Sequence, residues 1–423
     1  MQEQFLHYIW NLKLCNTQQL ATVNNEQIIV KSAGEHNTTK SGPDFFNAKI
    51  AIGGQLWAGN VEIHVKSSDW YLHNHQMDEN YDAVILHVVW EYDAQIFRSD
   101  NTAIPTLCLK DYVPESLIKN YQELMYNDRY IYCEKSILDV DNFLLNNWLE
   151  KLYIQRLAEK ATLAEELLKT HNNDYEAVLF LLLAKNFGLN VNGQAFFYML
   201  RDVDFSIIRK LRNQSVQLEA LLFGRANLLN DVLENNYYNQ LQEEYKFIQK
   251  KFNLKENLHI SVDFFRLRPN NFPTIRLAQL AALYGKHQQL FSEIINTQKI
   301  FDYYKLFKIQ PTEFWQNHYS FTSPSKKSNK YLSKSFIDLL LINTIIPLKF
   351  SYLKSIDRLN LDELFQTVTA IKSENNSVIA RFNEFGIKTN NALESQAVIQ
   401  LKNKYCNKKR CLQCDIGNDI LRN

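Results

Sequence analysis

The chain has 423 residues, of which 46% are hydrophobic and 22% are charged, and its formal net charge at pH 7 is +1. This length is sufficient for two or three domains with cores of their own, and the composition is ordinary for a folded, soluble protein. The small net charge excludes a global attraction to an acidic partner, so any nucleic-acid-binding surface must be local.

The N-terminus, MQEQFLHYIWNLKLCN, has no basic segment followed by an apolar stretch, which argues against a secretory signal. No uninterrupted apolar run approaches the roughly 18 residues that span a bilayer. We therefore expect a cytoplasmic protein with no membrane partner.

Residues 1–136 are predicted to form a mixed α/β domain with a sheet of four or five strands. Gly53-Gly54 joins two of the strands and is a strong hairpin signal, because both turn positions tolerate a positive φ. Short helices are predicted at 3–12 and 111–126. The predicted strands are EQIIVKS (26–32), FNAKIAI (46–52), QLWAGNVEIHVK (55–66), YDAVILHVVWEY (81–92) and IPTLCL (104–109).

Residues 137–400 are predicted to form a larger helical bundle, because apolar residues recur at helical spacing and no repeat has a fixed period. The basic stretch 322–335 is the most loop-like part of it. Residues 401–423 are expected to form a basic tail that contains cysteines. The predicted fold class of the whole chain is α+β. The predicted helices are 139–171, 175–188, 216–229, 238–252, 275–285 and 334–350.

The strand GNVEIHVK places a carboxylate, an imidazole and an ammonium on one face, because Glu62, His64 and Lys66 alternate with apolar residues. Asp44 precedes the other arm of the hairpin. A strict two-residue turn would put Asp44 and Glu62 on opposite faces, so a bulge near 58–60 or a three-residue loop is required to bring them together. The alternative is the solvated face of a half-buried strand.

Two neighbouring carboxylates repel each other, and a hard divalent cation relieves that repulsion. Mg²⁺ (or Mn²⁺) takes oxygen ligands, acidifies water and neutralises charge on a phosphoryl group. Asp44 and Glu62 are therefore the candidate ligands. His64 or Lys66 would orient the water or stabilise the developing negative charge.

The order of these elements resembles the PD-(D/E)XK nuclease superfamily, in Pro43-Asp44 and in Glu62-Ile63-His64. This resemblance implies a restriction-endonuclease-like sheet and Mg²⁺-dependent cleavage of nucleic acid, DNA in preference to RNA. His64 stands where the superfamily's pattern has Lys, and Lys66 is the candidate substitute. Since some members are catalytically inactive, a non-catalytic nucleic-acid-binding protein is an alternative.

The larger resemblance is to a bacterial domain-of-unknown-function family, number 2851, along essentially the whole chain. This family brings no established activity. The segments that carry the resemblance are GPDFFNAKI, GNVEIHVKSSDW, HNHQMDENYDAVILHVV, LRPNNFPTIRLAQLA and CLQCDIG.

Four residues near the strand are possible accessory groups: Asp69, His73, His75 and His87. If His73 and His75 converge with Glu62 and Asp69, the competing function is a transition-metal hydrolase of a small molecule. Otherwise His87 is a hydrogen-bonded core residue, and the other two histidines lie on a surface loop.

Arg266, Arg268 and Arg276 surround two prolines, and a helix is predicted to begin near the last of them. Forked guanidinium donors beside a helix N-terminus suit phosphate binding. The alternative is a structural clamp in which these arginines pair with acidic residues of the bundle.

The C-terminal run YCNKKRCLQCDIG contains Cys406, Cys411 and Cys414 around the basic residues 408–410, which favours thiolates and a soft metal. Cys133 is the candidate fourth ligand. The spacing is similar to iron–sulfur ligation and resembles the cluster-binding clasp of some PD-(D/E)XK exonucleases. Zinc and the absence of a metal are the alternatives.

Overall fold

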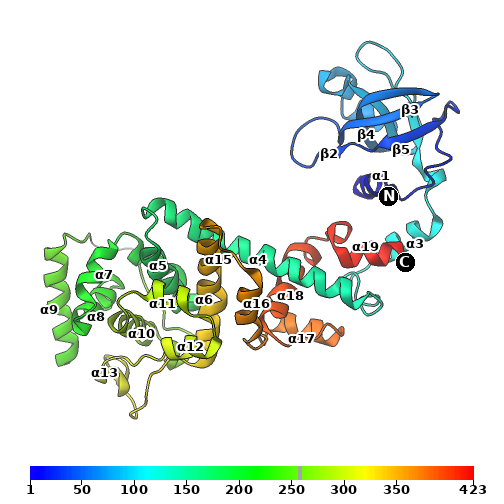
Figure 1. Ribbon diagram of the computed structural model, residues 1–423. Coiled ribbons are helices and arrows are strands. Elements are labelled where there is room, and N and C mark those ends of the chain that lie inside the picture. Colours follow the sequence, from blue (N-terminus) through cyan, green and yellow to red (C-terminus); the bar gives the residue numbers. More distant parts are fainter. Residues whose placement is uncertain (256–259) are drawn as a thin grey trace. The chain divides into compact units, whose positions relative to one another are not determined.

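The computed structural model describes residues 1–255 and 260–423 and contains two compact units. The N-terminal unit comprises residues 1–148 together with 402–423, and the helical unit comprises 149–401 (Figure 1). The predicted α+β class is confirmed, with a mixed sheet in the first unit and mostly helices in the second. Residues 402–423 belong to the N-terminal unit because Leu421 is buried in its core.

The sheet of the N-terminal unit has the order β1-β3-β4-β5-β6, and β2 also pairs with β3. β3 is antiparallel to β1 and β4, whereas β5 is parallel to both β4 and β6. All five predicted strands are present, and the two-residue β2 was missed because it is too short to leave a periodic signal. The strands are β1 (Ile28–Ser32), β2 (Glu35–His36), β3 (Phe45–Ile52), β4 (Gln55–Lys66), β5 (Val84–Glu91) and β6 (Thr106–Cys108).

A bulge in β3 sets the position of Asp44. The β3–β4 hairpin turns at Gly53-Gly54, both with positive φ, and its register is regular from Ile52↔Gln55 to Ala48↔Gly59. The register then shifts, so that Phe45 pairs with Val61. The shift spans Asn47, whose φ is +57°. The required correction therefore lies on β3, and the prediction that residues 58–60 would supply it was wrong for this pair of strands.

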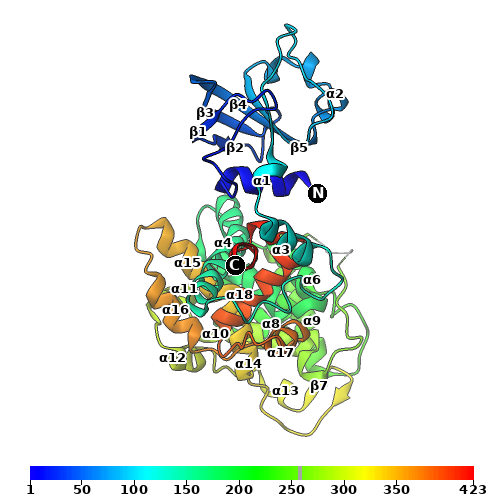
Figure 2. The same ribbon diagram turned by 90° about the vertical axis from the view of Figure 1, so that its right-hand side faces the viewer.

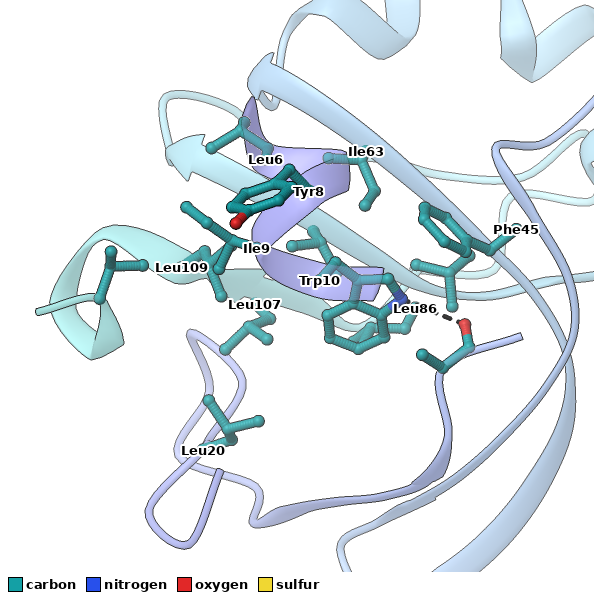
Figure 3. Packing of buried hydrophobic residues seen from close by; sticks show 14 of the residues in the cluster. Leu6, Tyr8, Ile9, Trp10, Leu20, Phe45, Ile63, Leu86, Leu107 and Leu109 are labelled. Carbon is teal, nitrogen blue, oxygen red and sulfur yellow. Dashed lines mark hydrogen bonds between the residues drawn. The ribbon is translucent and has the colours of Figure 1, made fainter. Parts of the chain in front are cut away.

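Helix α1 (Glu3–Leu12) packs its apolar side against the sheet and forms the core of the N-terminal unit (Figure 2). Figure 3 shows Leu6 and Trp10 of this helix among apolar side chains of the strands, including Ile63 and Phe45. The Trp10 indole N–H donates to the carbonyl of Ala33 at 3.1 Å. Helix α1 therefore covers the face of β4 that carries Ile63. Glu62 and His64 alternate with Ile63 and lie on the opposite face.

The other helices of the N-terminal unit are short. α3 is the predicted helix at 111–126, and the three C-terminal elements lie in the segment that was expected to be a tail. These helices are α2 (Asp69–Leu72), α3 (Glu115–Met125), the 3₁₀ turns His75–Met77 and Cys411–Gln413, the π-helix Leu401–Cys406 and α19 (Asp415–Arg422).

The helical unit contains all the helices predicted for 137–400. The long apolar segment Lys334–Ser355 comprises two α-helices joined by a π-helical turn. It is long and apolar enough to cross a membrane, but most of it is buried inside the unit, as in a core helix. The helices are α4 (Asn142–Thr170, which begins in the N-terminal unit), α5 (Tyr175–Phe187), α6 (Leu189–Arg201), α7 (Phe205–Leu211), α8 (Ser215–Arg225), α9 (Asn236–Lys251), α10 (Pro273–Lys286), α11 (Leu290–Asn296), α12 (Ile300–Leu306), α13 (Glu313–Gln316), α14 (Lys334–Leu340), α15 (Ile346–Ser355), α16 (Leu361–Thr369), α17 (Ser377–Glu384) and α18 (Ala392–Gln400).

Candidate metal centre

Glu62 and His64 lie on the outer face of β4, but this face is not solvated. Their exposed fractions are only 5% and 2%. The chain between β4 and β5 folds over them: the Trp70 ring contacts the ring of His75, which also stacks on Tyr81 at 3.7 Å. The interpretation of this face as the wet side of a strand is therefore wrong for Glu62 and His64.

Three histidines from β4 and the following connection converge on one point. One ring nitrogen from each of His64, His73 and His75 lies within 4.8 Å of the other two. His64 Nε2 is 3.1 Å from His73 Nδ1. Donors about 2.0–2.1 Å from a tetrahedral zinc ion stand about 3.3 Å apart. The trio therefore has spacing suited to one transition-metal ion.

The carboxylate of Glu62 lies beside this histidine trio. Its Oε1 is 3.3 Å from His75 Nε2 and 3.6 Å from His64 Nε2. His75 Nε2 is buried and makes no hydrogen bond with the described residues. A buried polar nitrogen without a hydrogen-bond partner is costly, and a metal ion would satisfy it. Glu62 can then serve as a further ligand or as a base at the edge of the site.

His87 on β5 lies behind His64. Its Nε2 is 2.8 Å from His64 Nδ1, and its side chain is fully buried. If the proton of this pair is on His64 Nδ1, His64 Nε2 is free to bind a metal ion. His87 is thus a hydrogen-bonded core residue that orients a candidate ligand.

The electrostatics of the site favour neutral imidazoles. Burial, followed by the charges of His75, His73 and His7, lowers the pKa of His64 to about 3. Burial also lowers the pKa of His75, and it holds that of His87 well below its usual value. Because a neutral imidazole is the form that binds metals, the rings of His64 and His75 are ready to act as ligands at neutral pH.

Asp44 and Glu62 are brought together, as the nuclease hypothesis requires. The Asp44 backbone N–H donates to Glu62 Oε2 at 3.1 Å, and the Ile63 N–H donates to Asp44 Oδ2 at 2.9 Å. Burial, followed by the charge of Asp44, raises the pKa of Glu62 to about 9. A cation at this position would relieve the repulsion between the two carboxylates.

Helix α1 adds two residues that the sequence analysis missed. His7 Nε2 lies 3.2 Å from Asp44 Oδ2 and 3.8 Å from Glu3 Oε1. Burial is the largest single effect and lowers the pKa of His7, but the contact with Asp44 and the charges of Asp44, Glu3 and Glu62 together raise it overall. The available signal was the spacing of Glu3 and His7, one helical turn apart on an otherwise apolar helix.

Lys66 and Asp69 lie at the edge of this arrangement. Lys66 is exposed at the end of β4, and within the described residues its ammonium forms no ion pair with Asp44 or Glu62. The backbone N–H of Lys66 donates to Asp69 Oδ2 at 2.9 Å, which orients the start of α2. His64, rather than Lys66, stands beside the carboxylates.

The three arginines do not form one cluster. Arg276 is buried, and its guanidinium donates to Gln279 Oε1 at 2.9 Å and Asn271 Oδ1 at 2.6 Å. Arg276 therefore has a structural role, as the alternative to phosphate binding proposes, but its partners are neutral amides instead of acidic residues. Arg268 and Arg276 both line a cavity of about 260 Å³, whereas Arg266 is exposed and lies over Phe265.

The four cysteines predicted as soft-metal ligands all belong to the N-terminal unit, where Cys133 and Cys411 pack against the same hydrophobic core. Cys414 is buried and the others are half-buried, and none of them forms a disulfide.

The fold and these side chains define an α+β protein with a buried imidazole–carboxylate cluster on the outer face of its sheet. The chain belongs to the DUF2851 family, described as a protein of unknown function, whose sequence profile matches residues 3–377. The match contains the whole cluster and ends before the C-terminal cysteines. No curated protein and no solved structure matches the chain.

Proposed function

We propose that the protein is a metal-dependent hydrolase whose metal ion is bound by His64, His73 and His75. The observation that carries this proposal is the convergence of three ligand nitrogens within 4.8 Å. Imidazole ligands favour Zn²⁺, Fe²⁺, Ni²⁺ or Cu²⁺ over Mg²⁺. Three protein ligands also leave a coordination position open, as catalytic sites do and closed structural zinc sites do not.

A divalent metal ion at such a site acidifies water and polarises the substrate. Glu62 is placed to accept the proton that an attacking water loses, because its Oε1 lies 3.3 Å from a ligand nitrogen. Burial and the charge of Asp44 raise the pKa of Glu62 to about 9, so the group is protonated at neutral pH when no cation is present. A metal ion beside it would stabilise the carboxylate, which is the form that accepts a proton. His87 would hold the ring of His64 in place through the 2.8 Å contact.

A phosphodiester is the substrate class that we infer first. The pairing of Asp44 with Glu62 beside a β-hairpin matches the two half-motifs of the PD-(D/E)XK pattern, and His64 takes the place of its Lys. The side chain of His73 is exposed, so this edge of the site is in contact with solvent. A small-molecule substrate remains the alternative for the same centre.

The second candidate is a Mg²⁺-dependent nuclease that uses the oxygen ligands alone. It is favoured by the 3.1 Å hydrogen bond that holds Asp44 beside Glu62. In this case the histidines would only shape the pocket. The two candidates therefore differ in whether the imidazoles bind the metal.

The test uses the full chain and three variants: His73→Ala, Glu62→Gln and Asp44→Asn. Bound metal is measured by mass spectrometry, and hydrolysis is measured with bis-p-nitrophenyl phosphate, DNA and RNA. His73 is exposed, so its removal perturbs folding least. His171→Ala, in the helical unit, is the matched control.

We expect His73→Ala to lose both metal and activity, Glu62→Gln to retain metal but lose activity, and His171→Ala to retain both. Mg²⁺-dependent cleavage that persists in His73→Ala and disappears in Asp44→Asn would establish the second candidate instead. Binding of nucleic acid without hydrolysis under any metal would leave a non-catalytic binding protein.

A further inference from the structure

Four cysteines from two distant parts of the chain belong to the N-terminal unit, and we call them the thiol quartet: Cys133, Cys406, Cys411 and Cys414. Cys133 lies between α3 and α4, and the other three lie at the end of the π-helix, in the following 3₁₀ turn and at the start of α19. The remaining cysteines, Cys15 and Cys108, are not part of this group.

Cys411 and Cys414 of the quartet lie in one tight turn. The backbone N–H of Cys414 donates to the carbonyl of Cys411 at 3.2 Å. Gly417 packs so closely on the backbone of Cys411 that no Cβ would fit there. The backbone N–H groups of Ile416 and Gly417 donate to the Cys414 sulfur. Such N–H···S hydrogen bonds stabilise thiolate ligands.

Separate contacts bring Cys133 to this turn. Lys402 donates to the carbonyl of Tyr130 at 2.7 Å and lies 3.5 Å from the centroid of its ring. Lys409 lies over the ring of Tyr132, the neighbour of Cys133, at 5.5 Å. The two lysines also place positive charge beside the quartet, where four thiolates would carry negative charge.

Without a metal this arrangement is unfavourable for thiolates. Cys414 is buried and the other three are half-buried, so a thiolate at any of them has lost much of the hydration that it would have in water. A soft cation reverses this preference, because it replaces the protons and screens the four sulfurs from one another.

We propose that the thiol quartet binds an iron–sulfur cluster that fastens the C-terminal segment to the N-terminal unit. The spacing of the sulfurs favours a cluster over a single zinc ion. Four sulfurs at about 2.3 Å from zinc would stand about 3.8 Å apart. Among the described residues, the histidine trio is the only group with three ligand atoms mutually within 4.8 Å, so no three sulfurs of the quartet lie that close together. A cluster, which carries sulfide between its irons, spans such a space.

This proposal is independent of the hydrolase, because none of its residues belongs to the histidine site. The test is to purify the full chain without oxygen and to measure iron, zinc, acid-labile sulfide and visible absorption. We expect iron and sulfide in equal amounts and a brown colour. Cys411→Ser and Cys133→Ser should lose the cluster, whereas the controls Cys15→Ser and Cys108→Ser should keep it.

Hydrogen exchange gives a second measurement. Residues 402–423 should exchange faster in Cys411→Ser than in Cys108→Ser, because the segment has lost its fastening. One zinc per chain without iron would overturn the cluster, as would iron that persists in both quartet variants. Wild-type protein that stays free of metal after anaerobic reconstitution with iron and sulfide would overturn it as well. The iron, zinc and sulfide content of the wild-type protein tests the proposal even where a variant fails to fold.

Discussion

The backbone N–H of Asp44 donates a hydrogen bond to Glu62 Oε2, although 18 positions separate the two residues in the chain. The β3 bulge makes this contact possible, because it shifts the pairing so that Asp44 comes opposite Glu62 rather than Ile63. The contact between Asp44 and Glu62 beside the candidate centre therefore depends on the bulge in β3. No residue of β3 itself is a proposed metal ligand.

Asn47 is the residue that permits this bulge. Its φ of +57° is tolerated by Asn and Gly but is strained for a β-branched residue. We expect Asn47→Val to destabilise the protein by about 1–3 kcal/mol and to weaken metal binding, whereas Asn47→Gly should change little. Urea denaturation and metal titration measure the two effects. Equal stability of the Val and Gly variants would contradict the role of the bulge.

His87 is predicted to act through His64. Replacing it by Phe keeps an apolar, aromatic side chain in the core but removes the 2.8 Å contact to His64 Nδ1. We expect metal affinity to fall about 10–100-fold, as for other partners of metal-binding histidines. Titration with Co²⁺, followed by its visible spectrum, measures the affinity and the geometry of the site. An unchanged affinity in folded His87→Phe would show that the contact has no such role.

Metal binding is also predicted to stabilise the folded protein. A ligand at 100 times its Kd that binds only the native state adds about 2.7 kcal/mol to the free energy of unfolding. Wild-type protein should therefore melt at a higher temperature with Zn²⁺ than with a chelator. His73→Ala should show no such difference, and His171→Ala should behave as the wild type. A Zn²⁺ effect that survives in His73→Ala would place the ion elsewhere.

The sequence was sufficient for the five longer strands and the most strongly periodic helices, but not for β2, for several helices of the helical unit or for all of the site. The strands and long helices follow from apolar periodicity, which local sequence reports directly. The grouping of Asp44 with Glu62 was predicted from the hairpin, but the place of the bulge was not, because it depends on the φ of Asn47. His73 and His75 lie in short turns without periodicity, so only the packing of Trp70 and Tyr81 could place them.

For the helices, the sequence predicts the apolar face but not the partners of individual side chains. Arg276 was predicted to bind phosphate because it lies near a helix N-terminus, yet its guanidinium donates to the nearby Asn271 and Gln279 and lies over the ring of Phe336, a contact that local sequence does not show. His7 was missed because α1 is remote in sequence from β3 and β4. Periodicity shows that a helix has an apolar face, but it does not show which strand that face covers.

Glu219 in the helical unit gives a prediction that is independent of any metal. Its buried carboxylate accepts hydrogen bonds from Tyr237 at 2.6 Å, Trp315 at 2.8 Å and Thr312 at 2.9 Å. Glu219→Ala leaves these buried donors without an acceptor, so we expect a loss of about 3 kcal/mol or more in the free energy of unfolding. Glu219→Gln keeps the shape and part of the bonding and should lose less. A smaller loss for Ala than for Gln would contradict this account.

The same residue predicts a dependence of stability on pH. Burial raises the pKa of Glu219 despite its three donors, so the folded state holds its proton more tightly than the unfolded state does. The stability that this proton contributes is complete below the unfolded pKa of about 4.3 and is lost as the pH rises through the folded pKa. Glu219→Gln does not titrate, so its unfolding free energy should fall less than that of the wild type as the pH rises above this value. Chemical denaturation at a series of pH values measures the difference, and parallel curves for the two proteins would show that Glu219 is ionised alike in both states.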